Sequence, residues 1–300
     1  MRPIRILVIY LAFVFLGAAL VAPWIYGALQ LIGQHALGDI AKQPFHRYVN
    51  RSLIILALAG LWPFLRALGI RSWRDLGFAP IRLHWKGVVA GFAAGFLSLA
   101  VLAGLVILLG ARSLNLTHSV TDLCAKLAGA ILTGVVVAVL EETLFRGALF
   151  GTLRKAQPWP LALGVSSAIY AIVHFFAKAP PPASVNWLSG FRTLAEMLRG
   201  FADFQTLVPG FFNLLIVGAI LALMYQRTGN LYFSIGLHAG WIFWLKSYGV
   251  LTKKVSGASS WLSGTGKMTD GWLATAILLL TLLALFLFTR RTNRDSHAVR

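Results

Sequence analysis

Long apolar runs, separated by short polar segments, follow one another along almost the whole chain. A hydrocarbon core about 30 Å thick takes roughly 20 apolar residues per helical crossing. Eight runs reach or approach that length, and they cover residues 6–33, 50–69, 87–110, 124–153, 159–178, 207–227, 230–250 and 271–289. The pattern predicts an all-α fold, a polytopic membrane helical bundle of about eight transmembrane helices, with residues 1–300 forming a single integral membrane domain.

The first two runs need separate interpretation. The first follows Arg2 and Arg5, as the apolar core of a signal peptide would. It continues to Ile32, which is longer than a typical signal core, so we expect an uncleaved first membrane helix. The second run is the weakest of the eight, because Pro63 and Arg66 interrupt it.

The segment 180–206 has a different pattern from the rest of the chain. Three prolines, Pro180 to Pro182, end the fifth run, because proline cannot continue a helix. Apolar residues then recur at helical spacing with charged residues between them: Phe191, Leu194, Ala195, Leu198 and Phe201 among Arg192, Glu196 and Arg199. This predicts an amphipathic interfacial helix, which either covers the entrance to a site or simply lies on the membrane.

Composition agrees with a lipid-embedded chain. Of the 300 residues, 58% are hydrophobic and only 12% are charged, whereas a soluble domain carries about a quarter charged residues. The net charge of +18 raises the question of nucleic acid. The basic residues lie between the apolar runs and form no contiguous patch, so we expect no nucleic-acid partner. The single cysteine, Cys124, excludes an intrachain disulfide and a cysteine-cluster metal site.

The distribution of basic residues also predicts the orientation. Eight crossings put both termini on one side of the membrane. Fourteen Lys and Arg residues then fall on that side and twelve on the other, which favours cytoplasmic termini under the positive-inside rule. The short segment from Arg66 to Lys86 supplies five of the fourteen. We expect an integral membrane protein, of a bacterial inner membrane, with its termini in the cytoplasm.

Two adjacent glutamates stand inside the fourth apolar run. Ionisable residues within membrane helices are costly, so each one suggests a functional role. Glu142 and Arg146 are four residues apart and share a helix face, where they can form an ion pair. Glu141 is turned away from that face and is the less neutralised carboxylate, which suits a general base acting on water. A helix-packing salt bridge is the alternative, although two carboxylates for one arginine argue against it.

Two histidines occupy other apolar runs, His174 in the fifth and His238 in the seventh. A lone membrane histidine is more often an interhelical hydrogen-bond partner than a catalyst. Measured from the expected cytoplasmic helix ends at 1.5 Å per residue, Glu141, His174 and His238 lie roughly 18, 24 and 12 Å deep. Helix tilt can absorb this spread, so the three side chains could share one cavity.

Three motifs in order carry a family resemblance. Glu-Glu-x-x-x-Arg on one membrane helix, aromatic-x-x-x-His on the next and a later Gly-x-His resemble the CAAX protease and bacteriocin-processing family, also called CPBP or Abi, which includes the type II CAAX prenyl endopeptidases. The run from Leu221 to His238 looks like that family's approach to its last histidine. The resemblance covers a motif core over residues 125–250. It implies a hydrolase, an intramembrane endopeptidase that cleaves a membrane-associated protein or peptide substrate within the lipid bilayer.

The resemblance also implies a role for each motif residue. Glu141 would be the base that activates water, while Glu142 and Arg146 would form a structural pair. His174 would help to position or deprotonate the water, and His238 would stabilise the oxyanion.

Two positions depart from the family pattern. Tyr170 replaces the Phe that usually begins the second motif, so its hydroxyl could find a partner in the site. Ile242 replaces the Asn that usually ends the last motif, and losing one such oxyanion donor typically costs about 10² to 10³ in rate. Either another donor substitutes, with Asn213, Ser234 or Trp241 as candidates, or this member is slow, differently specific or inactive.

A metal and two other functions stay open at this point. Two histidines and a glutamate are a recognised set of zinc ligands, so Glu141, His174 and His238 could hold zinc and make the chain a metalloprotease. Ile242 favours a non-catalytic immunity or sorting-accessory protein that binds a peptide. Buried Glu, Arg and His also build the relays of a proton-coupled transporter, although no inverted repeat is evident.

Overall fold

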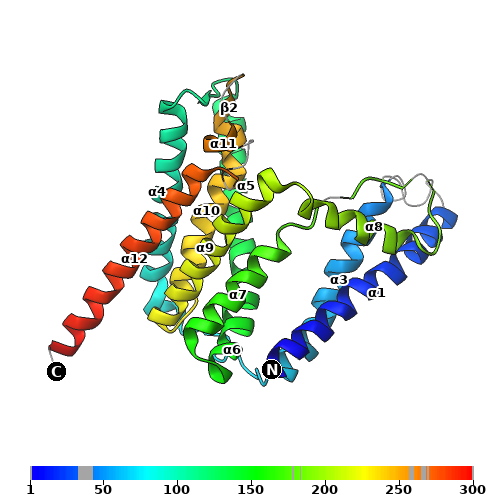
Figure 1. Ribbon diagram of the computed structural model, residues 1–300, viewed down its shortest axis with the longest axis horizontal. Helices are drawn as coiled ribbons and strands as arrows, with labels where there is room; N and C mark the ends of the chain where they lie inside the picture. The colour runs from blue at the N-terminus through cyan, green and yellow to red at the C-terminus, as the bar shows by residue number, and fades with distance from the viewer. Residues whose placement is uncertain are drawn as a thin grey trace. The chain divides into compact units, whose positions relative to one another are not determined.

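A computed structural model describes residues 2–32, 43–177, 179–182, 184–256, 260–264, 268 and 270–298. These residues are almost entirely helical, which confirms the predicted all-α class (Figure 1). Their contacts divide the chain into two compact units. Unit 1 comprises Met1–Arg71 and His174–Asp203, and unit 2 comprises Ser72–Val173 and Phe204–Arg300.

Unit 1 is built on two long helices, α1 (Arg2–Ile32) and α3 (Phe45–Ala67), which pack against each other. The shorter α8 (Ser189–Met197) and the 3-10 turn η3 (Leu198–Phe201) complete the unit. Glycine lets the elements approach closely, because a Cβ at Gly190 of α8 would overlap the carbonyl oxygen of Ala19 in α1. The predicted helix within 180–206 is therefore present as α8 and η3, and its place at a membrane surface stays a prediction.

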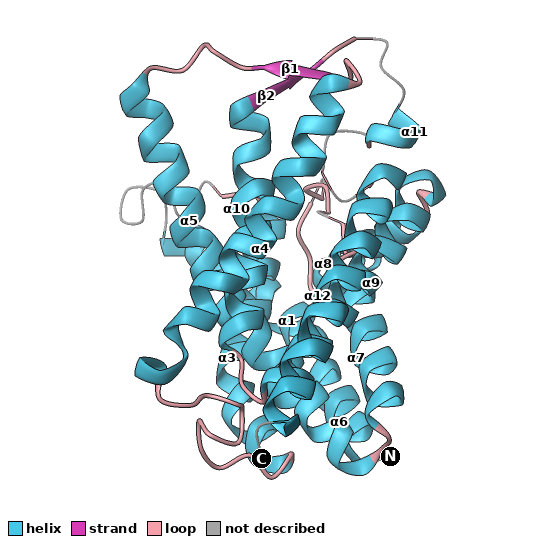
Figure 2. Ribbon diagram, turned by 90° about the vertical axis from the view of Figure 1, so that its left-hand side faces the viewer, coloured by secondary structure: helices cyan, strands magenta, loops and turns pink. Residues whose placement is uncertain are grey.

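Unit 2 holds the remaining helices. They are α4 (Ile81–Leu108), α5 (Val120–Glu142), the π-helical η2 (Thr143–Phe150), α6 (Gly151–Ala156), α7 (Trp159–Val173), α9 (Phe204–Thr228), α10 (Tyr232–Leu251), α11 (Ser260–Ser263) and α12 (Trp272–Ala298). Two short strands, β1 (Arg112–Leu114) and β2 (Thr252–Lys254), pair antiparallel beyond the ends of α4 and α10 (Figure 2). The first strand follows α4 and the second follows α10, so the ribbon ties these two helices together.

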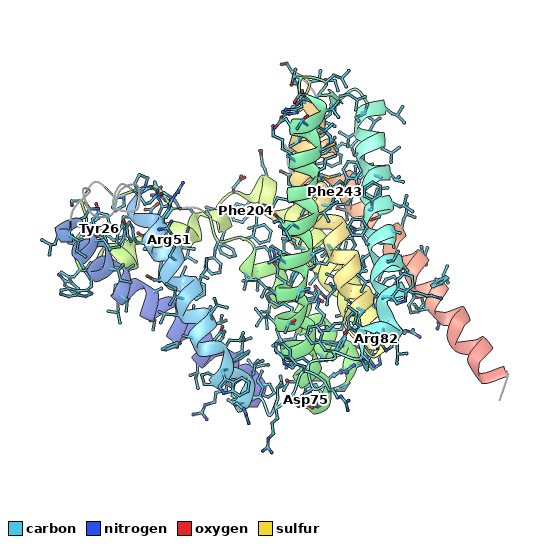
Figure 3. The ribbon with its side chains drawn as sticks, turned by 180° about the vertical axis from the view of Figure 1, so that it is seen from behind. Tyr26, Arg51, Asp75, Arg82, Phe204 and Phe243 are labelled. Carbon is cyan, nitrogen blue, oxygen red and sulfur yellow. The ribbon has the colours of Figure 1, made fainter. Side chains whose placement is uncertain are left out.

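Helix α10 runs through the interior of unit 2, between α4 and α5. Most of its residues are buried, including Phe243, which lies among the packed side chains in Figure 3. Both α4 and α10 carry a Gly-x-x-x-Gly pair, Gly91–Gly95 and Gly236–Gly240. A Cβ at Gly236 would overlap the Val88 carbonyl oxygen, and a Cβ at Gly91 would overlap that of Phe233. Small residues at these positions let the two backbones touch, as in closely packed membrane helices.

Six helical segments of the described chain are long and apolar enough to cross a membrane. They are Pro3–Ile32, Phe45–Ala67, Ile81–Leu108, Val120–Ala156, Leu207–Thr228 and Trp272–Arg290. Each of the eight predicted runs contains a helix, and the polytopic membrane bundle is confirmed. Two runs fall outside the six: α7 has only 15 residues, and α10, with 20, carries polar residues such as His238 and Lys246 within its apolar sequence.

The end of α7 differs from the prediction. The fifth apolar run was expected to stay helical to residue 178, but α7 ends at Val173, and His174 lies in the turn that follows. The chain leaves the helix early because it bonds elsewhere: the Ala177 N–H donates to the carbonyl of Met197 at the end of α8 (2.7 Å). His174 is therefore not on a membrane helix, which corrects the placement inferred from hydropathy.

Candidate active site

The glutamate pair lies where the helix changes its hydrogen-bonding pattern. Glu142 is the last residue of α5, and the next eight residues form the π-helical turns of η2. The Thr143 hydroxyl donates to the Val139 carbonyl at this junction (2.6 Å). π-helical segments are rare and often mark functional sites, because the widened turn re-aims the side chains that it carries.

Glu142 and Arg146 form the ion pair that their spacing predicts. The Arg146 guanidinium lies 3.0 Å from Glu142 Oε1, and both side chains are buried, at 2% exposure for Arg146 and 0% for Glu142. A second guanidinium nitrogen donates to the Gly218 carbonyl of α9 (3.4 Å). Burying two charges is tolerated when they are paired and hydrogen-bonded in this way. The pair therefore joins η2 to α9 as well as neutralising one of the two carboxylates.

His238 of α10 approaches the same carboxylate. Its Nδ1 lies 2.8 Å from Glu142 Oε1. Because a carboxylate can only accept, this contact assigns the proton to Nδ1 and leaves Nε2 facing the other way. Oε1 of Glu142 thus accepts hydrogen bonds from both Arg146 and His238, and the second bond fixes the plane of the imidazole. His238 therefore makes the interhelical hydrogen bond expected of a membrane histidine through Nδ1. Its other ring nitrogen, Nε2, is not used in that bond.

Glu141 lies beside that second nitrogen. Its Oε2 is 3.8 Å from His238 Nε2, so the two glutamates approach opposite sides of one imidazole. The Glu141 side chain is 25% exposed, whereas Glu142 is fully buried. The structure therefore separates the two carboxylates as the spacing predicted, with Glu142 held by Arg146 and Glu141 more accessible.

Tyr170 of α7 completes the cluster. Its hydroxyl lies 3.5 Å from His238 Nε2 and also interacts with the Glu141 carboxylate. Its ring stacks beneath the Arg146 guanidinium, whose central carbon is 4.5 Å from the ring centroid, and it meets Phe145 edge-on. The motif pattern predicts only a structural role for Tyr170. In the structure, its hydroxyl lies beside both His238 and Glu141.

The remaining candidates of the last motif are engaged elsewhere. Ile242, one turn beyond His238, is buried and offers no donor. The three suggested substitutes each donate to another segment: Asn213 to the Gly271 carbonyl just before α12 (3.2 Å), Trp241 to Ser98 Oγ of α4 (2.9 Å) and Ser234 to the Leu221 carbonyl of α9 (3.0 Å). The structure does not bring them into the Glu141–His238 cluster, and their role as oxyanion donors stays untested.

His174 belongs to unit 1, whereas Glu141 and His238 belong to unit 2. A role for His174 beside these two residues therefore stays a prediction. In the described residues, no group of three or more His, Cys, Asp or Glu side chains could hold a metal. Within unit 2, Glu141 and His238 supply two of the three ligands that a catalytic zinc site typically uses, and His174 would have to supply the third. Zinc therefore stays a prediction.

Comparison with known proteins agrees with the motifs. Residues 124–244 match the family described as type II CAAX prenyl endopeptidase Rce1-like. The matched segment contains the whole cluster, from Glu141 to His238, and the resemblance inferred from the three motifs is confirmed. Neither the curated proteins nor the solved structures gave a match to the chain.

Proposed function

Because residues 124–244 carry the signature of the type II CAAX prenyl endopeptidase family, we propose that the chain is an intramembrane endopeptidase that uses a glutamate-activated water. The family match and the six apolar helices support a membrane-embedded, CAAX-type hydrolase. The observation that carries the mechanism is the imidazole of His238 held between Glu142 and Glu141.

Glu141 is the proposed base. It is the more accessible carboxylate of the pair, at 25% exposure, whereas Glu142 is fully buried against Arg146. In the proposed step it takes one proton from water while the water oxygen bonds to the scissile carbonyl carbon. The carbonyl oxygen becomes an oxyanion, and the C–N bond then breaks as the proton passes to the leaving amine. General acid–base assistance of this kind typically contributes about 10² to 10⁴ in rate.

Glu142 and Arg146 act through their neighbours. The bond from His238 Nδ1 to Glu142 fixes both the tautomer and the direction of Nε2. A carboxylate that accepts a hydrogen bond from a functional histidine orients its ring and is costly to remove. Arg146 holds the Glu142 carboxylate in place, since the pair is buried and hydrogen-bonded. The proposal therefore assigns positioning roles to both residues.

Tyr170 is the proposed source of the donor that Ile242 lacks. Its hydroxyl is the group that meets both His238 Nε2 and Glu141, and the Arg146 guanidinium over its ring anchors it. A hydroxyl placed there can donate to the developing oxyanion or to the neutral imidazole. The two departures from the family pattern then compensate each other.

The test compares two carboxylates on α5 in the full chain, reconstituted in proteoliposomes with a panel of lipidated and unlipidated peptides. Glu141→Gln keeps the shape of the side chain and removes the base, so cleavage should fall at least about 10²-fold. Asp122→Asn changes an exposed carboxylate in the first turn of the same helix, and cleavage should persist. Wild-type turnover in Glu141→Gln would refute the mechanism. A parallel chelator arm tests zinc, because loss of cleavage that zinc restores would add a metal to the site.

One observation favours a second candidate, a non-catalytic peptide-binding member. Ile242 is buried one turn from His238 and cannot donate a hydrogen bond. If Tyr170 does not replace that donor, wild-type chain cleaves no peptide of the panel while Ile242→Asn does. Robust cleavage by the wild type excludes this candidate.

A further inference from the structure

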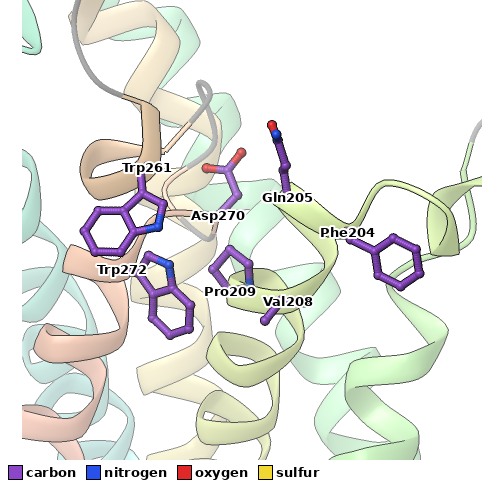
Figure 4. Close-up of a pocket in the computed structure, with 7 residues that line it drawn as sticks. All are labelled: Phe204, Gln205, Val208, Pro209, Trp261, Asp270 and Trp272. Carbon is purple, nitrogen blue, oxygen red and sulfur yellow. The ribbon is translucent and has the colours of Figure 1, made fainter.

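A second cavity opens in unit 2, where α9 and α12 begin. Its volume is about 460 Å³, and it is lined by Phe204, Gln205, Val208, Pro209, Trp261, Asp270 and Trp272. Figure 4 shows the Asp270 carboxylate between the Trp261 ring and the Gln205 side chain, while Phe204 lies apart from the others. The cavity contains none of the residues of the Glu141–His238 cluster, so it is a separate site.

The lining groups are of the kinds that bind cations. The Trp261 and Trp272 rings lie close together, with their centroids 6.4 Å apart and their planes inclined at 47°. Asp270 is 7% exposed and adds a carboxylate inside the cavity. Aromatic faces attract ammonium groups, and Trp does so most strongly. A primary ammonium would also donate hydrogen bonds to the Asp270 carboxylate and to the amide oxygen of Gln205.

The position of the cavity identifies the kind of ammonium. The apolar span Trp272–Arg290 begins at a residue that lines the cavity, and the span Leu207–Thr228 begins next to another, Val208. The cavity therefore lies at the end of the hydrocarbon layer, where lipid headgroups are found. Tryptophans often lie at this level simply as an interfacial belt. A belt does not require a buried carboxylate beside the rings, and Asp270 supplies one here.

We propose that this cavity binds the ammonium of a phosphatidylethanolamine headgroup. The headgroup would enter past Trp261, which lines the cavity and is 71% exposed. Its acyl chains would then follow the apolar surfaces of α9 and α12. A volume of this size falls within the range of small-ligand pockets. The site goes beyond the proposed proteolysis and does not depend on it.

The experiment titrates the purified full chain with phosphatidylethanolamine and, separately, with phosphatidylglycerol of the same acyl chains, and counts bound lipids by native mass spectrometry. Wild-type chain should prefer phosphatidylethanolamine about tenfold, and Asp270→Asn should abolish the preference. Because Asp270 is buried, Trp261→Leu serves as a second variant that replaces an exposed ring. Trp159→Leu is the matched control, since Trp159 is an exposed ring of unit 2 outside the cavity, and it should keep the preference.

The outcomes separate the possible sources of the cation. Equal binding of the two lipids by wild-type chain, or a preference that survives both Asp270→Asn and Trp261→Leu, overturns the proposal. A third arm uses water-soluble phosphoethanolamine as the probe. If it competes as strongly as the lipid, the site takes a soluble cation and the lipid assignment is wrong. Preference for the lipid, lost in both variants and kept in Trp159→Leu, supports it.

Discussion

Helix contacts in the two units can be compared directly. In unit 2, α10 touches α4 through the paired glycines around Gly236, and in unit 1, α1 touches α3 through Gly17 and Gly60. Near the first contact, α10 presents His238 to two carboxylates and an arginine pairs with one of them. Near the second, the Tyr10 hydroxyl donates to the Ala57 carbonyl (2.8 Å), a bond between two neutral groups.

The difference lies in what close packing is used for. Around α10 it holds charged groups that are costly to bury, so that removing one partner strands another. Around α1 and α3 it brings apolar and aromatic side chains together, as in the Tyr10–Phe64 stack with ring centroids 4.3 Å apart. We therefore expect substitutions in the first region to affect both stability and cleavage, and substitutions in the second to affect stability alone.

The largest expected effect comes from breaking the buried ion pair. Arg146→Met leaves Glu142 buried without its cation, and the free energy of unfolding should fall by about 3–5 kcal/mol. The matched control is Arg199→Met in unit 1, where Arg199 lies 2.7 Å from Glu196 but is 71% exposed. That exposed pair should contribute about 0–1 kcal/mol. Unfolding in mixed micelles measures the loss in free energy of unfolding for both variants. Equal losses would show that burial does not determine how much each ion pair contributes to stability.

The next effect is on cleavage. Tyr170→Phe removes a hydroxyl that meets His238 and Glu141 but keeps the ring beneath Arg146. Loss of one oxyanion donor typically costs about 10² to 10³, so kcat should fall by about 10²-fold or more while KM changes little. Thermal unfolding checks that the fold is kept. An unchanged kcat would leave Tyr170 with a packing role only, and would reopen the search for a donor.

A smaller effect is expected from overfilling the α4–α10 contact. In Gly236→Ala the new methyl group meets the Val88 carbonyl and the Phe92 backbone nitrogen, which cannot move aside cheaply. Overpacking of this kind costs about 1–3 kcal/mol. Gly249→Ala on the same helix meets nothing within 4 Å, and it should be neutral or slightly stabilising, since alanine is the better helix former. Equal losses in the two variants would mean that the close contact is not what holds α10.

Part of this region could be predicted from the sequence. Helical spacing predicted the Glu142–Arg146 pair, because residues four apart share a helix face whatever surrounds them. The contact between His238 and Glu142 could not be derived in this way, since it depends on how α10 is rotated against α5. One signal was available, the Gly-x-x-x-Gly pairs at 91–95 and 236–240, which favour a close contact between the helices that carry them.

Other features had no local signal. The π-helical turn after Glu142 follows no residue pattern. The end of α7 at Val173 depends on a bond from Ala177 to Met197, twenty positions further along the chain. The second cavity combines the start of α9 with Trp261 and Asp270, and no spacing rule connects these segments. Local periodicity therefore predicts helices and single-helix pairs, whereas the site needs contacts that only the folded chain supplies.

The smallest effect is expected in unit 1 from Tyr10→Phe. The same Tyr-to-Phe change at position 170 of unit 2 is expected to lower kcat. Tyr10→Phe removes one hydroxyl and keeps the stack on Phe64. The Ala57 carbonyl loses the hydrogen bond from the Tyr10 hydroxyl but remains part of helix α3. The free energy of unfolding should therefore fall by about 1 kcal/mol. The cleavage rate should equal that of the wild type. Measured beside Tyr170→Phe, this pair holds the chemical change constant and varies only the region. A comparable loss of kcat in Tyr10→Phe would show that α1 contributes to turnover and that the division between a catalytic and a packing region is wrong.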